Sequence, residues 1–254
     1  MIRSSKPTQA DSVATHDQEP NALTWETLSS EAYEAYNGLL VDQASRLWRE
    51  AMTVSQSIPP EDPRHCATLN NAGIVDFLDE ALDRSVDTLN RALAGWQKAR
   101  DWTASMEVNG TAKSSLFHHR LEVRHQKHFA QHTRSRYCNW IDGAEAITAF
   151  NLSQVLGHLN RKEEALRHLT KALNLRQQAF GSANPELALI LRSMARLSDD
   201  ETVSASCLEH AHQAERNPTR TSLQRWQADC PRKMNDTRRL LGAICMTAMM
   251  AQAG

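Results

Sequence analysis

Proline and glycine, the residues that most often interrupt helices, are scarce in this chain. It has 8 prolines and 9 glycines among 254 residues, and no proline lies between residues 64 and 184. Proline inside a helix removes a backbone hydrogen bond and clashes with the preceding turn, so its absence leaves that long stretch free to form helices. The prolines at 59, 60 and 63 mark a loop just before it. This distribution favours a helical protein with little or no strand.

Long apolar runs are also absent. No segment reaches the roughly 18 consecutive apolar residues of a membrane-spanning helix, and residues 1–20 lack the apolar stretch of a secretory signal. The 5 cysteines are widely spaced and form no Cys-x-x-Cys pair. This spacing argues against a disulfide framework or zinc knuckle and is typical of reduced cytoplasmic thiols. A net charge of −1 provides no overall field that would attract nucleic acid.

Signatures of catalysis are missing as well. The sequence has no Gly-x-Ser-x-Gly, no glycine-rich phosphate loop and no His-Glu-x-x-His. His65 and Cys66 are neighbours, but adjacent residues on a helix point about 100° apart, so they do not form a dyad by themselves. We therefore expect a protein without enzymatic activity and without a cofactor.

What the chain does contain is a repeat of about 40 residues. A small–large–small triplet at positions i, i+4 and i+7 places three side chains on one helix face, where another helix can approach closely. Its copies end at residues 51, 92, 132, 172 and 211, which are 39 to 41 residues apart. The copies are Ala44-Trp48-Ala51, Ser85-Leu89-Ala92, His125-Phe129-His132, Ala165-Leu169-Ala172 and Ser204-Leu208-Ala211. Such a period is typical of stacked helix pairs.

The period predicts an all-α array of about five helix-turn-helix pairs with a C-terminal capping helix. Residues 1–22 are polar and patternless and are expected to form a disordered arm, residues 23–217 the repeat domain, and residues 218–254 the helical cap. Gly181 is expected to end a helix. The expected pairs are 25–38 with 41–57, 64–78 with 80–99, 103–117 with 118–136, 142–158 with 161–180, and 184–198 with 201–216.

Two blocks of the sequence carry a family resemblance. Residues 149–197 resemble tetratricopeptide repeats of the long, kinesin-light-chain type, in which a helix pair ends in a Gly-x-x-x-Pro loop, here Gly181 to Pro185. Residues 47–93 resemble the same repeat more weakly, with Leu-Asn-Asn at 69–71 in the first helix. The resemblance implies a right-handed superhelix. It also implies a concave groove, lined by the first helices, that binds extended peptides or helices of partner proteins.

The resemblance also implies which residues would line that groove. In several family members asparagines hold the ligand backbone, and Asn71 and Asn151 occupy the matching positions. An amide suits this role because it donates to a peptide carbonyl and accepts from its N–H at once. We expect both side chains on the concave side, free of strong internal bonds; alternatively, they satisfy neighbouring helix ends or solvent. The groove neighbours expected from helical spacing are Asn70, Gln154, His158 and Arg192.

A histidine-rich segment supports a different hypothesis. His118, His125, His128 and His132 fall on one helix face, at spacings that suit a transition metal or zinc. The same segment is also consistent with a degenerate repeat whose histidines are partly buried and hydrogen-bonded, or with a pH-sensitive surface. A metal-binding accessory protein that uses helix 118–132 is therefore the alternative function.

The C-terminal segment is apolar on most sides over residues 240–250. A repeat array leaves the apolar face of its last pair uncovered, so this segment is expected to cap it. A dimer, partner or membrane-surface contact would use the same methionine-rich run. Taken together, the sequence predicts a cytoplasmic, non-enzymatic scaffold or adaptor for a protein or peptide partner, with no nucleic acid, no membrane span and no metal. The identity of the partner and the oligomeric state stay open.

Overall fold

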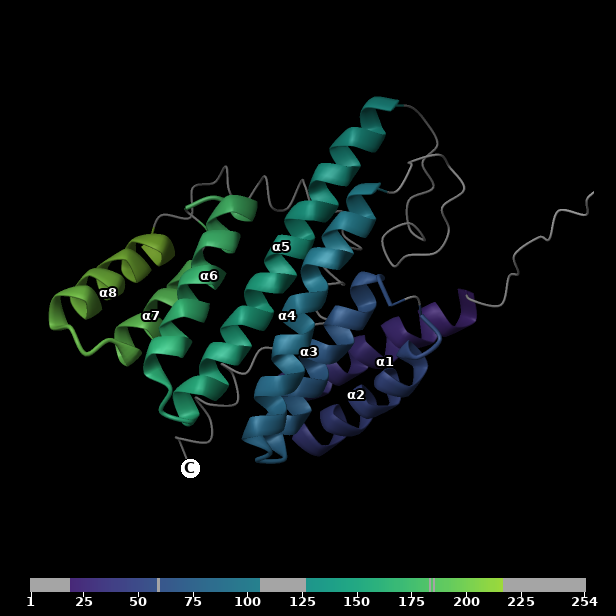
Figure 1. The fold of residues 1–254 in the computed structure, drawn as a ribbon, viewed down its shortest axis with the longest axis horizontal. Helices are drawn as coiled ribbons and strands as arrows, with labels where there is room; N and C mark the ends of the chain where they lie inside the picture. Colours follow the sequence, from purple (N-terminus) through teal and green to yellow (C-terminus); the bar gives the residue numbers. More distant parts are fainter. Residues whose placement is uncertain (1–18, 59, 106–126, 183, 185, 217–254) are drawn as a thin grey trace, which may run out of the picture.

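Eight helices make up the regular structure of the part of the chain that the computed structural model describes, which is residues 19–58, 60–105, 127–182, 184 and 186–216. The helices follow one another across the molecule in chain order (Figure 1). Their bounds are α1 Glu19–Asn37, α2 Val41–Ser55, α3 Pro63–Leu78, α4 Leu82–Ser105, α5 Lys127–His158, α6 Lys162–Phe180, α7 Leu187–Leu197 and α8 Glu201–Arg216. The all-α prediction is confirmed, and no strand occurs in these residues.

The helices pack as four consecutive pairs. Each helix makes its main contacts with the helices before and after it in the chain, both within the pairs α1–α2, α3–α4, α5–α6 and α7–α8 and between them. First helices also touch directly, because α3 contacts α5. A stack in which each unit contacts only its neighbours is a helical repeat array.

The same turn closes three of these pairs. The linkers 38–40, 79–81 and 159–161 each have a middle residue with positive φ, namely Leu39 at 65°, Glu80 at 60° and Asn160 at 57°. The residue after each of them donates a backbone hydrogen bond to a carbonyl five residues earlier, such as Arg161 N to Leu156 O at 2.9 Å. This left-handed turn satisfies the last carbonyls of the first helix and reverses the chain.

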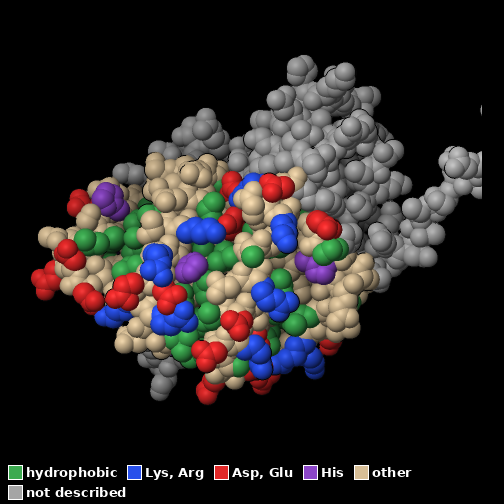
Figure 2. Space-filling model, in the orientation of Figure 1, with side chains coloured by type: hydrophobic (Ala, Val, Ile, Leu, Met, Phe, Trp, Pro, Cys, Tyr) green, Lys and Arg blue, Asp and Glu red, His purple; other side chains and the backbone are tan. Residues whose placement is uncertain are grey.

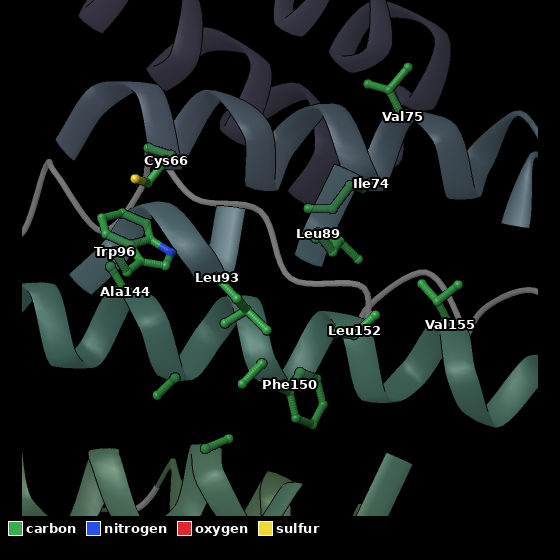
Figure 3. Packing of buried hydrophobic residues seen from close by; sticks show 14 of the residues in the cluster. Cys66, Ile74, Val75, Leu89, Leu93, Trp96, Ala144, Phe150, Leu152 and Val155 are labelled. Carbon is green, nitrogen blue, oxygen red and sulfur yellow. The ribbon is translucent and has the colours of Figure 1, made fainter. Parts of the chain in front are cut away.

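The triplets lie on the second helices and form the packing face predicted for them. All three members are buried in α2, α4 and α6, and their large central residues belong to the main core. Figure 3 shows side chains of α3, α4 and α5 meeting in this core, among them Leu89, Trp96 and Leu152. The His125-Phe129-His132 copy lies outside the residues whose side chains the structure describes.

Glycines let the helices of one pair approach closely. A Cβ atom built on Gly73 of α3 would lie 2.5 Å from Cγ of Leu89, the centre of the α4 triplet. The Ser85 hydroxyl donates to the Gly73 carbonyl at 2.6 Å in the same contact. Two small groups therefore face each other around one large side chain, as the triplet predicts.

The prediction for the third pair is wrong for its second helix, which was expected over residues 118–136. The helix break expected between residues 136 and 142 is absent, because α5 runs without interruption from Lys127 to His158 and packs directly on α4. Gly143 lies inside α5 and does not end it; a Cβ there would meet the Phe180 ring at 2.7 Å, so the glycine makes room for α6. Residues 106–126 lie outside the described residues, within which the array has four pairs instead of five.

The described helices run from Glu19 to Arg216, and the domain bounds 23–217 stay a prediction. Helix α1 begins at Glu19, inside the segment expected to be an arm, and α8 ends at Arg216. Gly181 follows α6 with a φ of 85°, as expected for a helix-ending glycine. The described helices include none that is long and apolar enough to cross a membrane. The rest of the predicted arm and the predicted cap lie outside the described residues.

Candidate partner-binding surface

One side of α3 and of α5 lies where these two first helices meet, within the main core. On α3, Gly73 is turned toward α4, and Thr68 accepts a hydrogen bond from Trp25 Nε1 of α1 at 2.8 Å. Residues at i, i+4 and i+7 on another side of the helix share a face. We call the six residues on this face the inner stripe. They are Ala67, Asn71 and Ile74 of α3 and, 80 residues later like the triplets, Ile147, Asn151 and Gln154 of α5.

The asparagines of this region form a connected cluster between two first helices. Asn151 Nδ2 of α5 donates to Asn70 Oδ1 of α3 at 2.9 Å, and Asn70 Nδ2 donates to Asn71 Oδ1 at 3.1 Å. All three side chains are buried, and none is without a partner. The expectation that Asn71 and Asn151 are free of internal hydrogen bonds is therefore wrong. The physical reason is that α3 and α5 approach closely, so their polar atoms must satisfy one another.

The other expected groove residues are distributed over several contacts. Gln154 is buried and accepts a hydrogen bond from Arg196 of α7 at 2.8 Å. His158 is exposed, and its ring meets Phe77 of α3 edge-on with centroids 5.1 Å apart. Arg192 pairs instead with Glu215 of α8 at 2.8 Å, so it is tied to its own helix pair and not to the inner stripe.

Side-chain bonds thus link each first helix to the next. They join α1 to α3 through Trp25 and Thr68, α3 to α5 through the asparagines, and α5 to α7 through Gln154 and Arg196. Sequence reasoning missed these links, although one signal was present. Thr148 lies 80 residues after Thr68 and likewise accepts from a tryptophan Nε1, that of Trp96, at 3.0 Å. The links hold the inner stripe in a fixed arrangement.

A charged cluster connects α5 with α4 and α6. Glu145 is buried and receives Arg100 Nη2 of α4 and Lys171 Nζ of α6, each at 2.8 Å. Arg100 also pairs with Asp142. Removing one partner from such a partly buried cluster leaves a charge uncompensated, so the cluster fixes the position of α5 between its neighbours.

The described residues offer no sign of catalytic or metal chemistry. Burial, followed by the nearby Asp62 and Glu145 charges, raises the pKa of the Cys66 thiol to about 12, so the thiol is not a nucleophile at neutral pH. No group of three potential metal ligands occurs among the described residues. The histidines expected to bind metal, His118 to His132, lie outside the residues whose side chains are described.

The charged surface shows no dominant sign on the face seen in Figure 2. Lysine and arginine side chains are interspersed there with aspartate and glutamate. Exposed ion pairs such as Arg161–Glu164 and Lys162–Asp199 also occur among the described residues. A mixed surface of this kind does not concentrate the positive field that nucleic acid requires.

The last described helix has an open face. The central triplet residues Trp48, Leu89 and Leu169 are 1%, 0% and 0% exposed, whereas their counterpart Leu208 in α8 is 40% exposed. Val203 of the same helix is 46% exposed. The difference arises because a further helix pair covers the triplet in the earlier repeats and none of the described helices follows α8.

Comparison with known proteins identifies one repeat. Residues 148–186, which span the last third of α5, all of α6 and the following loop, match the family model described as tetratricopeptide repeat. No curated protein matches the chain. The match confirms the family resemblance in the block where the loop glycine and the triplet were clearest, while the kinesin-light-chain type stays a prediction.

Proposed function

We propose that this chain, a helical array with a tetratricopeptide repeat at residues 148–186, is a non-enzymatic scaffold that binds a segment of a partner protein along its inner stripe. Repeats of this family are interaction modules. In the second helices α2, α4 and α6 of this chain, the triplet faces are buried by packing against other helices. The first helices are therefore the elements proposed to meet the ligand, through exposed residues beside the inner stripe such as His158, since Asn71 and Asn151 themselves are buried. A segment that follows them would cross α3, α5 and α7 in turn.

The observation that carries the proposal is the equivalent placement of amide side chains on two successive first helices. Asn71 of α3 and Asn151 of α5 lie 80 residues apart, at the same place in the repeat. Both amides are buried and belong to the hydrogen-bonded cluster between α3 and α5, so they hold the two repeats in register while exposed residues beside them are proposed to contact the partner. Exposed His158 continues this side of α5 to its C-terminal end. The bonds between the first helices preorganise the surface, which lowers the entropic cost of binding.

The proposal includes a cellular setting. Cys66 and Cys207, which are buried, are free thiols, as expected for a protein that resides in the cytoplasm. No feature of the described residues calls for a cofactor, and the partner is proposed to be a protein or peptide.

The test compares two exposed histidines. Partners are captured by crosslinking to the full chain in the native cell and then measured with purified components. His158→Glu places a charge beside the inner stripe and should weaken binding at least tenfold, whereas His210→Glu, at an exposed position of α8, should leave it unchanged. Equal binding by both variants would show that the partner does not use the inner stripe.

A further inference from the structure

One face of a second helix makes the junction with the pair that follows it. In α4 this face includes Trp96, whose Nε1 donates to Thr148 of α5 at 3.0 Å. The four residues of the face are at most 9% exposed, and they are Val86, Leu89, Leu93 and Trp96. The equivalent positions of α8, 119 residues later like the triplets, are Ala205, Leu208, His212 and Glu215. All four are exposed, so α8 carries a junction face that no described helix covers.

Helix α7 adds to this open end of the array (Figure 1). Arg192 of α7 pairs with Glu215 at 2.8 Å, so the exposed sides of the two helices adjoin. Leu189, one helical turn before Arg192, is 36% exposed, and Leu208 is 40% exposed. We call six residues the end face, namely Leu189, Arg192, Ala205, Leu208, His212 and Glu215. A pair that simply ends an array is expected to have a polar outer face, whereas this one exposes two leucines.

The other end of the described array is polar. Glu31 and Glu34 of α1 are exposed, and they occupy the positions of Ala72 and Val75 in α3, which are each 4% exposed. If a second copy stacked its α1 on the end face, these two carboxylates would lie against Leu208. Desolvating them there is costly, so the charges oppose a head-to-tail array of copies.

The exposed side of α8 is instead complementary to itself when two copies of the helix run antiparallel. Glu201 and Arg216 lie at its two ends, and Leu208 lies near its middle. A two-fold axis beside Leu208 places Glu201 of each copy next to Arg216 of the other. The same axis places the small Ala205 next to the larger His212. Opposite charges and unequal sizes thus meet twice, as an interface between two identical surfaces requires.

We infer that the end face binds a second copy of this chain, so that the protein forms a two-fold dimer through antiparallel α8 helices. The face continues the junctions that join the pairs within one chain, and its charges match across the two-fold axis. Helix α8 has 16 residues and is about 24 Å long. An interface of this size is small, so the dimer is expected to dissociate on dilution. The inner stripe takes no part, and the inference is independent of the proposed function.

Sedimentation equilibrium of the full chain, over a hundredfold range of concentration, tests the dimer. The wild type should pass from monomer to dimer without larger species. Leu208→Glu should weaken the dimer at least tenfold, whereas Leu40→Glu, at a leucine that is 56% exposed in the α1–α2 turn, should leave it unchanged. A monomer at every concentration, as when residues 217–254 of the same copy cover the end face, would overturn the inference. A dimer that Leu208→Glu leaves intact, or open-ended growth, would overturn it as well.

A charge swap tests the two-fold arrangement. Glu201→Arg alone and Arg216→Glu alone should each weaken the dimer at least fivefold, because like charges then face each other twice. An equimolar mixture of the two variants should form a mixed dimer as tight as the wild type, because each copy then meets charges opposite to its own. Circular dichroism checks that both variants keep the helix content of the wild type. If the mixture dimerised no better than either variant alone, the antiparallel pairing of α8 would be refuted.

Discussion

Gly73→Ala should destabilise the protein, although alanine is the better helix former. Replacing a glycine inside a helix by alanine ordinarily gains about 0.5–1 kcal/mol. At this position the new Cβ would lie 2.5 Å from Cγ and 2.7 Å from Cδ2 of Leu89, whose side chain is fully buried. Overpacking of this kind costs about 1–3 kcal/mol, so we expect a net loss of about 1–2 kcal/mol in the free energy of unfolding.

Gly157→Ala is the matched control. Gly157 is also inside a first helix, but its new Cβ would lie 3.6 Å from the nearest atom, Leu197 Cδ2, which is ordinary contact. This variant should gain about 0.5–1 kcal/mol. Urea unfolding followed by circular dichroism measures both variants, and opposite signs are the expected result. If Gly73→Ala stabilised the protein as Gly157→Ala does, the interlocking of α3 with the α4 triplet would be refuted.

A double-mutant cycle isolates the contact. Leu89→Ala alone should cost about 2–5 kcal/mol because it leaves a cavity. In that background Gly73→Ala no longer meets a side chain and should be neutral or stabilising. The coupling between the two positions is then about 1–3 kcal/mol. A coupling near zero would mean that Gly73→Ala acts on something other than Leu89.

Three further predictions concern the turns, acid stability and the buried thiol. Leu39→Gly should raise the free energy of unfolding by about 1 kcal/mol, because Leu39 holds a left-handed φ of 65°. Asn160→Gly should be near neutral, because asparagine tolerates that conformation. Thermal unfolding compares the two variants, and equal effects would argue against strain at Leu39. Burial, and then two cations on the same helix, lower the pKa of His168 below 6.5, so the unfolded chain binds a proton that the folded chain does not. Stability should therefore be lost as pH falls below about 6.5, and His168→Gln should flatten that fall between pH 7 and 5 in urea titrations; an unchanged profile would exclude His168 as the cause. Cys66, with its pKa raised to about 12, should react with iodoacetamide at pH 8 about a thousandfold more slowly than a free cysteine, and unfolding in urea should abolish the difference, as mass spectrometry of its peptide would show.

The sequence predicted the parts of the fold that depend on local pattern. Triplet spacing identified the second helices, and the glycine and proline positions located their ends, because side-chain size and backbone freedom act within a few residues. It failed at α5, where separate helices were expected over 118–136 and 142–158 and one helix, Lys127–His158, is present. Only the structure shows that Gly143 lies inside this helix and makes room for Phe180 of α6.

The candidate surface, too, could be predicted from the sequence only in part. The sequence placed Asn71 and Asn151 at equivalent points of two repeats, and the structure agrees with that register. It did not predict that Asn151 donates to Asn70 across α3 and α5, because a contact between residues 81 positions apart depends on how closely the two helices approach. The burial of these amides could likewise be recognised only in three dimensions.

The central claim is that a partner protein lies along the inner stripe, and site-specific photocrosslinking in the native cell tests it most directly. A photoreactive residue replaces His158, which is exposed at the end of α5 beside the stripe, or Met52, which is exposed on the outer side of α2. The account predicts a specific crosslinked partner from position 158 and none from position 52. The same partner captured from position 52 and absent from position 158 would contradict it.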